Sequence, residues 1–161
     1  MNDVRLSYSC QSGTTASRTL LLQYLKALHR ESQHQESYPD QRPQQRSKHL
    51  AHFVDQYLGD DHRVWWAREP TQSQPIGCLW LGYTVDPIDG DRHPYIFLLY
   101  VLPSYRRHGI GRALITQAEA WAKERGYRKL SLHVFCQNEA GQHFYQQLSY
   151  HPQSTLMEKT L

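Results

Sequence analysis

Long hydrophobic runs are missing from this chain of 161 residues, since no apolar stretch approaches the 18 residues needed to cross a membrane. The N-terminus also lacks the basic, apolar and small-residue pattern of a secretory signal. Cysteine is scarce: Cys10, Cys78 and Cys136 have neither C-x-x-C nor zinc spacing, so reduced thiols are expected. We therefore predict a cytoplasmic protein with no membrane partner and no disulfide framework.

The chain also lacks a strong excess of one charge. Its formal net charge is +3, and it contains no run of five or more lysines and arginines. Nucleic-acid-binding proteins usually carry such a basic cluster, so no nucleic-acid partner is expected. The ten histidines are scattered and include no H-x-x-x-H pair, so no metal site is expected either.

The chain does contain enough apolar sequence for one core. Its length of 161 residues predicts a single domain over residues 1–161, and a hydrophobic content of 39% is low but adequate for the core. Strand-like and helix-like patterns alternate, which predicts an α/β or α+β domain with a mixed sheet and helices on both faces. Strands are predicted over 4–9, 63–68, 76–85, 95–102, 129–134, 150–152 and 155–160, and helices around 21–28, 50–58, 109–125 and 138–148.

The most informative segment runs from a strand through a glycine turn into a helix. Residues 95–102 form an apolar run that stops at Pro103, the basic turn 106–111 contains two glycines, and helical spacing follows. Glycines let a backbone approach an anion closely, and the free amides and dipole of a helix N-terminus favour negative charge. The segment therefore predicts a pyrophosphate site.

Two known pyrophosphate motifs do not fit this segment. The dinucleotide fingerprint needs a third glycine, where this chain has Leu114, and a carboxylate after the next strand, where it has none. The phosphate loop G-x-x-x-x-G-K-[ST] is absent. The turn, with Arg106, Gly109 and Gly111 at the fixed positions, instead resembles the [RQ]-x-x-G-x-[GA] signature of the GCN5-related N-acetyltransferases (GNAT family).

The segment after the next strand strengthens this resemblance. Asn138, Tyr145 and Tyr150 fall in register with a second family segment, while Ser149 replaces its usual glycine. The two segments occur in the family's order and cover the chain from Tyr95 to its end. The chain also resembles small bacterial members such as the ribosomal-protein alanine acetyltransferases.

The resemblance implies a fold and a cosubstrate. The implied fold has a mixed, mostly antiparallel sheet of six to seven strands, about four helices, and two central strands, 95–102 and 129–134, that splay apart. The implied cosubstrate is acetyl-CoA. The residues expected to bind it are Leu99, Tyr100, Val101, Arg106, Arg107, His108, Gly109, Ile110, Gly111, Arg112 and Asn138.

Tyr145 matches the family tyrosine that faces the cofactor sulfur, which implies a general acid. A phenol with an ordinary pKa of about 10 stays protonated at neutral pH and can donate to a departing thiolate. Ala140, Phe144 and Leu148 form an apolar stripe that leaves Tyr145 free to face the site; the alternative is a core aromatic. Asn138 could cap the last helix, contact the cofactor, or do both.

The general base departs from the family pattern. Many members carry a carboxylate on the strand before the glycine turn and others on the next strand, where this chain has His133 instead. A histidine can accept a proton near neutral pH, so His133 is the candidate base, with a packing role as the alternative. Weaker candidates in turns are Asp89, Asp91, His93 and Glu69.

Together these residues predict an acetyl-CoA-dependent N-acetyltransferase acting on a primary amine, which could be a small molecule, a polyamine, a peptide N-terminus or a lysine. A non-catalytic acyl-CoA-binding or sensing module on the same fold is the alternative, because the usual strand carboxylate is missing. Residues 31–48 have almost no apolar side chains and are predicted to be a mobile acceptor-side loop. A homodimer is a possible assembly, since the family often forms one.

Overall fold

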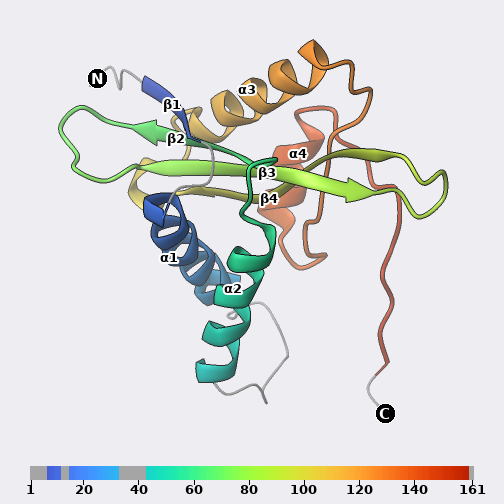
Figure 1. Ribbon diagram of the computed structural model, residues 1–161, viewed down its shortest axis with the longest axis horizontal. Coiled ribbons are helices and arrows are strands. Elements are labelled where there is room, and N and C mark those ends of the chain that lie inside the picture. The colour runs from blue at the N-terminus through green and yellow to red at the C-terminus, as the bar shows by residue number, and fades with distance from the viewer. Residues whose placement is uncertain (1–6, 12–14, 33–42, 160–161) are drawn as a thin grey trace.

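A five-stranded sheet forms the centre of the structure, which is a computed structural model describing residues 7–11, 15–32 and 43–159. Its elements are β1 (Ser7–Gln11), α1 (Thr15–Ser32), α2 (Pro43–Tyr57), β2 (Arg63–Arg68), β3 (Gly77–Val85), β4 (Arg92–Val101), α3 (Ile110–Glu124), β5 (Ser131–Leu132) and α4 (Glu139–Gln146). The strands lie in the order β1-β2-β3-β4-β5 (Figure 1). Neighbours are antiparallel except β4 and β5, which are parallel, so the sheet is mixed as predicted.

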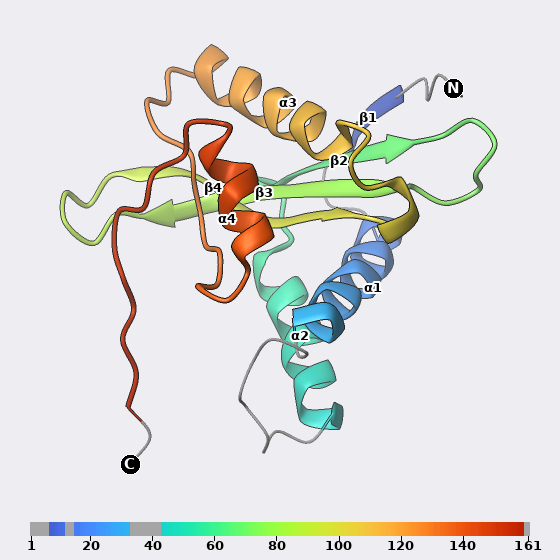
Figure 2. The same ribbon diagram turned by 180° about the vertical axis from the view of Figure 1, so that it is seen from behind.

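Helices cover both faces of the sheet. In β2, Val64 and Trp66 pack with α1 and α2, whereas Trp65 and Ala67 pack with α3. Figure 2 shows α3 and α4 on the face opposite α1 and α2. Because both faces are buried, β2 reads as a nearly continuous apolar run rather than as an alternating one. None of the described helices is long and apolar enough to span a membrane.

The start of α2 corrects one prediction. The helix begins at Pro43, where the missing N–H costs little because the first amides of a helix have no intrahelical partner. The mobile loop predicted over 31–48 is therefore wrong at both ends, since Glu31 belongs to α1 and residues 43–48 belong to α2. The rest of that prediction, 33–42, lies outside the described residues, as does part of the predicted first strand.

The sheet has fewer strands than predicted, with five rather than six to seven in the described part of the chain. The strand predicted over 129–134 shortens to β5, and residues 150–159, where a last strand pair was expected, have no regular structure. Leu156 and Met157 are exposed, so this segment buries too little apolar surface to pack as an additional strand pair. Figure 1 shows the segment leaving the body of the fold.

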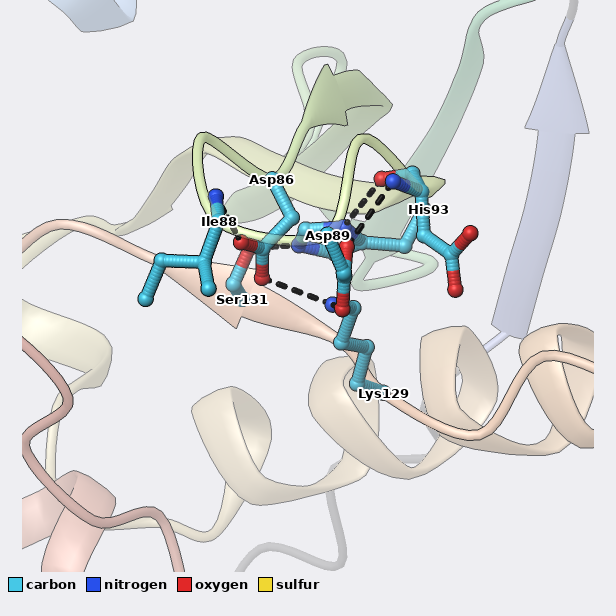
Figure 3. Close-up of polar contacts among 7 residues, drawn as sticks. Asp86, Ile88, Asp89, His93, Lys129 and Ser131 are labelled. Atoms are coloured by element: carbon cyan, nitrogen blue, oxygen red, sulfur yellow. Dashed lines mark hydrogen bonds and ion pairs between the residues drawn. The ribbon is translucent and has the colours of Figure 1, made fainter.

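Polar side chains hold the short strand β5 against the hairpin that joins β3 to β4. The Lys129 ammonium lies 2.7 Å from a carboxylate oxygen of Asp86 and 3.0 Å from one of Asp89. Beside it, Nε2 of the buried His93 lies 2.8 Å from the Ser131 hydroxyl (Figure 3). Backbone pairing joins β5 to β4 at two residue pairs, which is a short ladder. The side-chain contacts, which we call the hairpin clamp, therefore help to hold β5 in register.

The hairpin clamp predicts a specific acid sensitivity. The hydrogen bond from Lys129, followed by that from the Ile88 amide, lowers the pKa of Asp86 to about 2. Because this pKa is lower in the folded than in the unfolded state, the stabilising contribution is present above about pH 4 and is lost as the pH falls toward 2. Lys129→Met should therefore lower the melting temperature at pH 6 and differ less from wild type at pH 2.

Circular-dichroism melts across this pH range would check the prediction. Lys48→Met, which removes an exposed lysine of α2, is the matched control. A melting-temperature difference between Lys129→Met and wild type that stays constant down to pH 2 would contradict it.

Candidate active site

A small pocket opens where β4 and the chain after β5 separate. Their pairing ends at Ile96 and Leu132. Beyond this point lies a cavity of about 110 Å³, so the predicted splay of the two central strands is present. The pocket is bounded by the end of α1, by β4, by the segment after β5 and by α4, and its wall includes Leu28, Phe97, Leu99, His133, Asn138 and Tyr145.

A bulge in β4 shapes one wall of this pocket. Leu98 pairs with Trp80 and Ile96 with Leu81, which leaves Phe97 without a partner in β3. Phe97 and Leu98 therefore both pack on the face covered by α1 and α2, whereas Ile96 packs on the opposite face. Bulges often re-aim side chains at functional sites, and this one brings Phe97 to the pocket.

Tyr145 lies on α4 with its side chain on the pocket wall. Burial is the main cause that raises the pKa of its hydroxyl above the ordinary value, so the phenol is protonated at neutral pH. The predicted apolar stripe is only partly right: Ala140 is exposed, and both Phe144 and Tyr145 pack toward α3. Tyr145 thus combines core packing with access to the pocket.

His133 follows β5 directly and is exposed at the same pocket. Its Nδ1 is hydrogen-bonded to the hydroxyl of Tyr95 on β4. The two rings are tilted by 52° with their centroids 5.7 Å apart. The candidate acid and the candidate base therefore reach one pocket from different elements.

The weaker candidate bases lie outside the pocket wall. Asp89 and His93 belong to the hairpin clamp, and Asp91 is exposed in the same turn. Glu69 accepts a hydrogen bond of 2.6 Å from the hydroxyl of Tyr105. Of the candidate bases taken from the sequence, His133 is the one that the fold brings to Tyr145.

The glycine turn presents free amides at the start of α3. Gly109 has a φ of +78°, and no side chain caps the helix. The amides of Ile110, Gly111 and Arg112 have no acceptor within the described residues. A β-carbon on Gly109 would meet no atom within 4 Å, whereas one on Gly111 would lie 3.3 Å from the ring of Phe144. This open, donor-lined turn fits an anionic group such as a pyrophosphate.

Comparison with known proteins agrees with this geometry. Residues 23–150 match the model of the acetyltransferase (GNAT) family. The chain belongs to the GNAT family. Among solved structures, a GCN5-related N-acetyltransferase from Ralstonia eutropha JMP134 superimposes with a TM-score of 0.74 at 26% identity, covering 96% of this chain and 99% of that one.

Curated relatives match a smaller part of this GNAT chain. The uncharacterized N-acetyltransferase YdgE of Bacillus subtilis is 28% identical over 100 residues, which is 62% of each chain. Aminoglycoside N(6')-acetyltransferase type 1 of Acinetobacter genomosp. 13 is 40% identical over 81 residues, 48% of this chain and 56% of that one. The chain thus spans less than two thirds of the length of these relatives.

Two residues expected to bind the cofactor direct their side chains elsewhere in this GNAT chain. The buried Tyr100 donates a hydrogen bond of 2.8 Å to the carboxylate of Glu31, and Nη2 of Arg106 donates one of 2.6 Å to the same carboxylate. Nε of Arg106 also donates to the backbone oxygen of Val101 at 2.9 Å. Both side chains therefore tie the end of α1 to β4, while Arg107, His108 and Arg112 remain exposed at the turn.

Asn138 lies where both of its expected roles can be combined. Its side chain accepts a hydrogen bond of 2.9 Å from the Gly141 amide, which confirms the predicted cap of α4. It also lines the pocket. A β-carbon on Gly141 would lie 2.5 Å from the Asn138 amide, so glycine at this position leaves room for the cap.

The sequence interpretation missed the contribution of α1 and the partner of His133. Leu28 and His29 reach the pocket from a helix more than 60 residues before β4, and no local pattern signals that contact. Alternation does place Tyr95 and Phe97 on one face of the predicted strand, but it cannot identify His133 as the hydrogen-bond partner of Tyr95.

Proposed function

We propose that this protein is an acetyl-CoA-dependent N-acetyltransferase that acetylates a primary amine, with Tyr145 as general acid and His133 as general base. The observation that carries the proposal is that both side chains line one pocket at the splay of β4 and β5. Leu99 lies on the same wall and lies 4.0 Å from where a β-carbon of Gly111 would be, which joins the pocket to the free amides of α3.

Each residue then has a defined task. Bound acetyl-CoA supplies an acetyl group activated as a thioester. The amides at 110–112, together with Arg107 and Arg112, hold its anionic pyrophosphate. His133 takes a proton from the attacking amine, and Tyr145 gives a proton to the departing sulfur. The products are the acetylated amine and the free thiol. The enzyme returns to its starting state when His133 releases its extra proton to water and Tyr145 takes one from water.

The test is calorimetric titration with acetyl-CoA, with NAD as the control, followed by an assay of thiol release. The amine panel would contain an aminoglycoside, since one relative carries that name, a polyamine, a peptide with a free N-terminus and a lysine peptide. Selective binding of acetyl-CoA with turnover on one class would support the proposal. Binding without turnover on any amine would favour a non-catalytic acyl-CoA-binding module, and no binding would refute both.

A second prediction distinguishes the contributions of Arg106 and Arg112 to acetyl-CoA binding. The guanidinium of Arg106 is paired with Glu31, so Arg106→Gln should leave the salt dependence of acetyl-CoA binding nearly unchanged. Arg112→Gln should weaken binding at low salt and reduce that dependence, because its exposed guanidinium is available to phosphate. Calorimetry at two salt concentrations measures both. Equal changes in the two variants would contradict the assignment.

A further inference from the structure

Alternate residues around β5 each contact the hairpin formed by β3 and β4. These contacts form a side-chain ladder of three rungs: Lys129 with Asp86 and Asp89, Ser131 with His93, and His133 with Tyr95. The first two rungs are the hairpin clamp seen in Figure 3. The ladder extends the backbone pairing of β5, which covers two residues, up to the edge of the pocket.

The third rung determines which nitrogen of the His133 ring is available in the pocket. The hydroxyl of Tyr95 engages Nδ1, so Nε2 is the ring nitrogen left for a molecule in the pocket. Tyr95 is itself held by Phe97, with ring centroids 5.1 Å apart in an edge-on contact. The His133 ring is thus oriented by Tyr95, whose own ring packs against Phe97 on β4.

We propose that Tyr95 is a positioning residue for acetyl transfer, engaging Nδ1 of His133 and leaving Nε2 to take the proton of the acceptor amine. The inference rests on the proposed function and assigns a role to a residue that the glycine turn and the Tyr145 segment do not include. In the neutral ring Nδ1 carries the hydrogen and donates it to the Tyr95 oxygen, which leaves Nε2 without hydrogen and able to take a proton. After that transfer both ring nitrogens carry hydrogen, and Nδ1–H still donates to the Tyr95 oxygen. Such a charge-assisted hydrogen bond is stronger than the neutral one, so it favours proton uptake.

The surroundings of His133 support this role. Burial raises the pKa of Tyr95, so its hydroxyl is neutral across the working range of an imidazole. The other titratable side chains on the pocket wall, within the described residues, are His29 from α1 and Tyr145 from α4. No carboxylate is among the described wall residues. The Tyr95 hydroxyl contacts Nδ1, the ring nitrogen at which a carboxylate orients the histidine base of a catalytic triad.

The experiment compares Tyr95→Phe with Tyr83→Phe. Tyr83 lies on β3 and packs against Trp121 and Tyr127, so it controls for the loss of a tyrosine hydroxyl away from the pocket. Tyr95→Phe should lower kcat about tenfold, leave KM for acetyl-CoA unchanged and move the acidic limb of the kcat profile to lower pH. Tyr83→Phe should change none of these quantities.

A double-mutant cycle tests whether Tyr95 acts through His133. The double variant Tyr95→Phe/His133→Ala should be no slower than His133→Ala, because the positioning contact has nothing left to orient. The proposal would be overturned if the loss in the double variant equalled the sum of the losses in the two single variants. A Tyr95→Phe enzyme whose rate and pH profile match those of Tyr83→Phe would also overturn it.

Histidine NMR on the substrate-free protein gives an independent readout. His133 is assigned by the signal lost in His133→Ala. Its ring-nitrogen chemical shifts should report a hydrogen held on Nδ1 in the wild type and in Tyr83→Phe, and the loss of this preference in Tyr95→Phe. An unchanged tautomer in an active Tyr95→Phe enzyme would overturn the role of Tyr95 alone. A wild-type protein that acetylates no amine would overturn the proposed function, whatever the NMR result.

Discussion

Replacing Tyr145 by phenylalanine is expected to lower kcat by about 100-fold or more while leaving the affinity for acetyl-CoA nearly unchanged. The substitution removes one hydroxyl and keeps the ring, so the packing of α4 on the α3 side of the sheet is preserved. Because burial raises the pKa of this hydroxyl, it is protonated at neutral pH and able to give its proton to a departing thiolate.

Tyr150→Phe is the matched control for this prediction. The Tyr150 ring contacts the Tyr145 ring edge-on at 5.8 Å, so it lies in the same cluster but is not part of the pocket wall. Steady-state kinetics with saturating acetyl-CoA would measure both variants. If Tyr145→Phe lost no more activity than Tyr150→Phe, Tyr145 would be a core aromatic and the general acid would have to be sought elsewhere.

Gly109→Ala is expected to raise the dissociation constant of acetyl-CoA by about tenfold or more. The positive φ of Gly109 lets the turn direct the following amides outward, and an L-residue pays about 1–2 kcal/mol to adopt that conformation. Relief of this strain would rotate the amides of 110–112 away from the anion. Since about 1.4 kcal/mol corresponds to a tenfold change in affinity, a modest rearrangement is sufficient.

The chain offers a close control at the other end of the same helix. Gly126 has a φ of +77°, and a β-carbon on it, as on Gly109, would meet no atom within 4 Å. Gly126→Ala should therefore lower the melting temperature by a similar amount without affecting acetyl-CoA binding. Calorimetry and thermal melts on both variants separate the two effects. Equal losses of affinity would show that the cost is one of global stability rather than of the turn.

Local patterns predicted several elements well. The strand predicted over 63–68 is found with those bounds, and the helix after the glycine turn differs by one residue at each end from its prediction. The cap at Asn138 is one of the two roles that the sequence left open for this residue, and the structure shows it. These features depend on residues close in the chain, where strand hydrophobicity, helical spacing and capping chemistry act directly.

Other features could not be predicted because they depend on packing between distant segments. The strand predicted over 129–134 has a suitable composition, but two residue pairs join it to β4 before the chains separate into the pocket. The side chain of Arg106 fits a family signature, yet the fold pairs it with Glu31, 75 residues earlier. A signature position therefore does not specify what its side chain contacts.

By itself, the sequence determined the family of the protein, the glycine turn and the candidates for the acid and the base. Only the tertiary structure decided which of these meet. Tyr145 and His133 share a pocket because β4 bulges and β5 ends early, and Tyr95 reaches His133 because the hairpin clamp holds the intervening segment in register. Such contacts join residues far apart in the chain, and their geometry is set by how the helices and the sheet pack rather than by any local pattern.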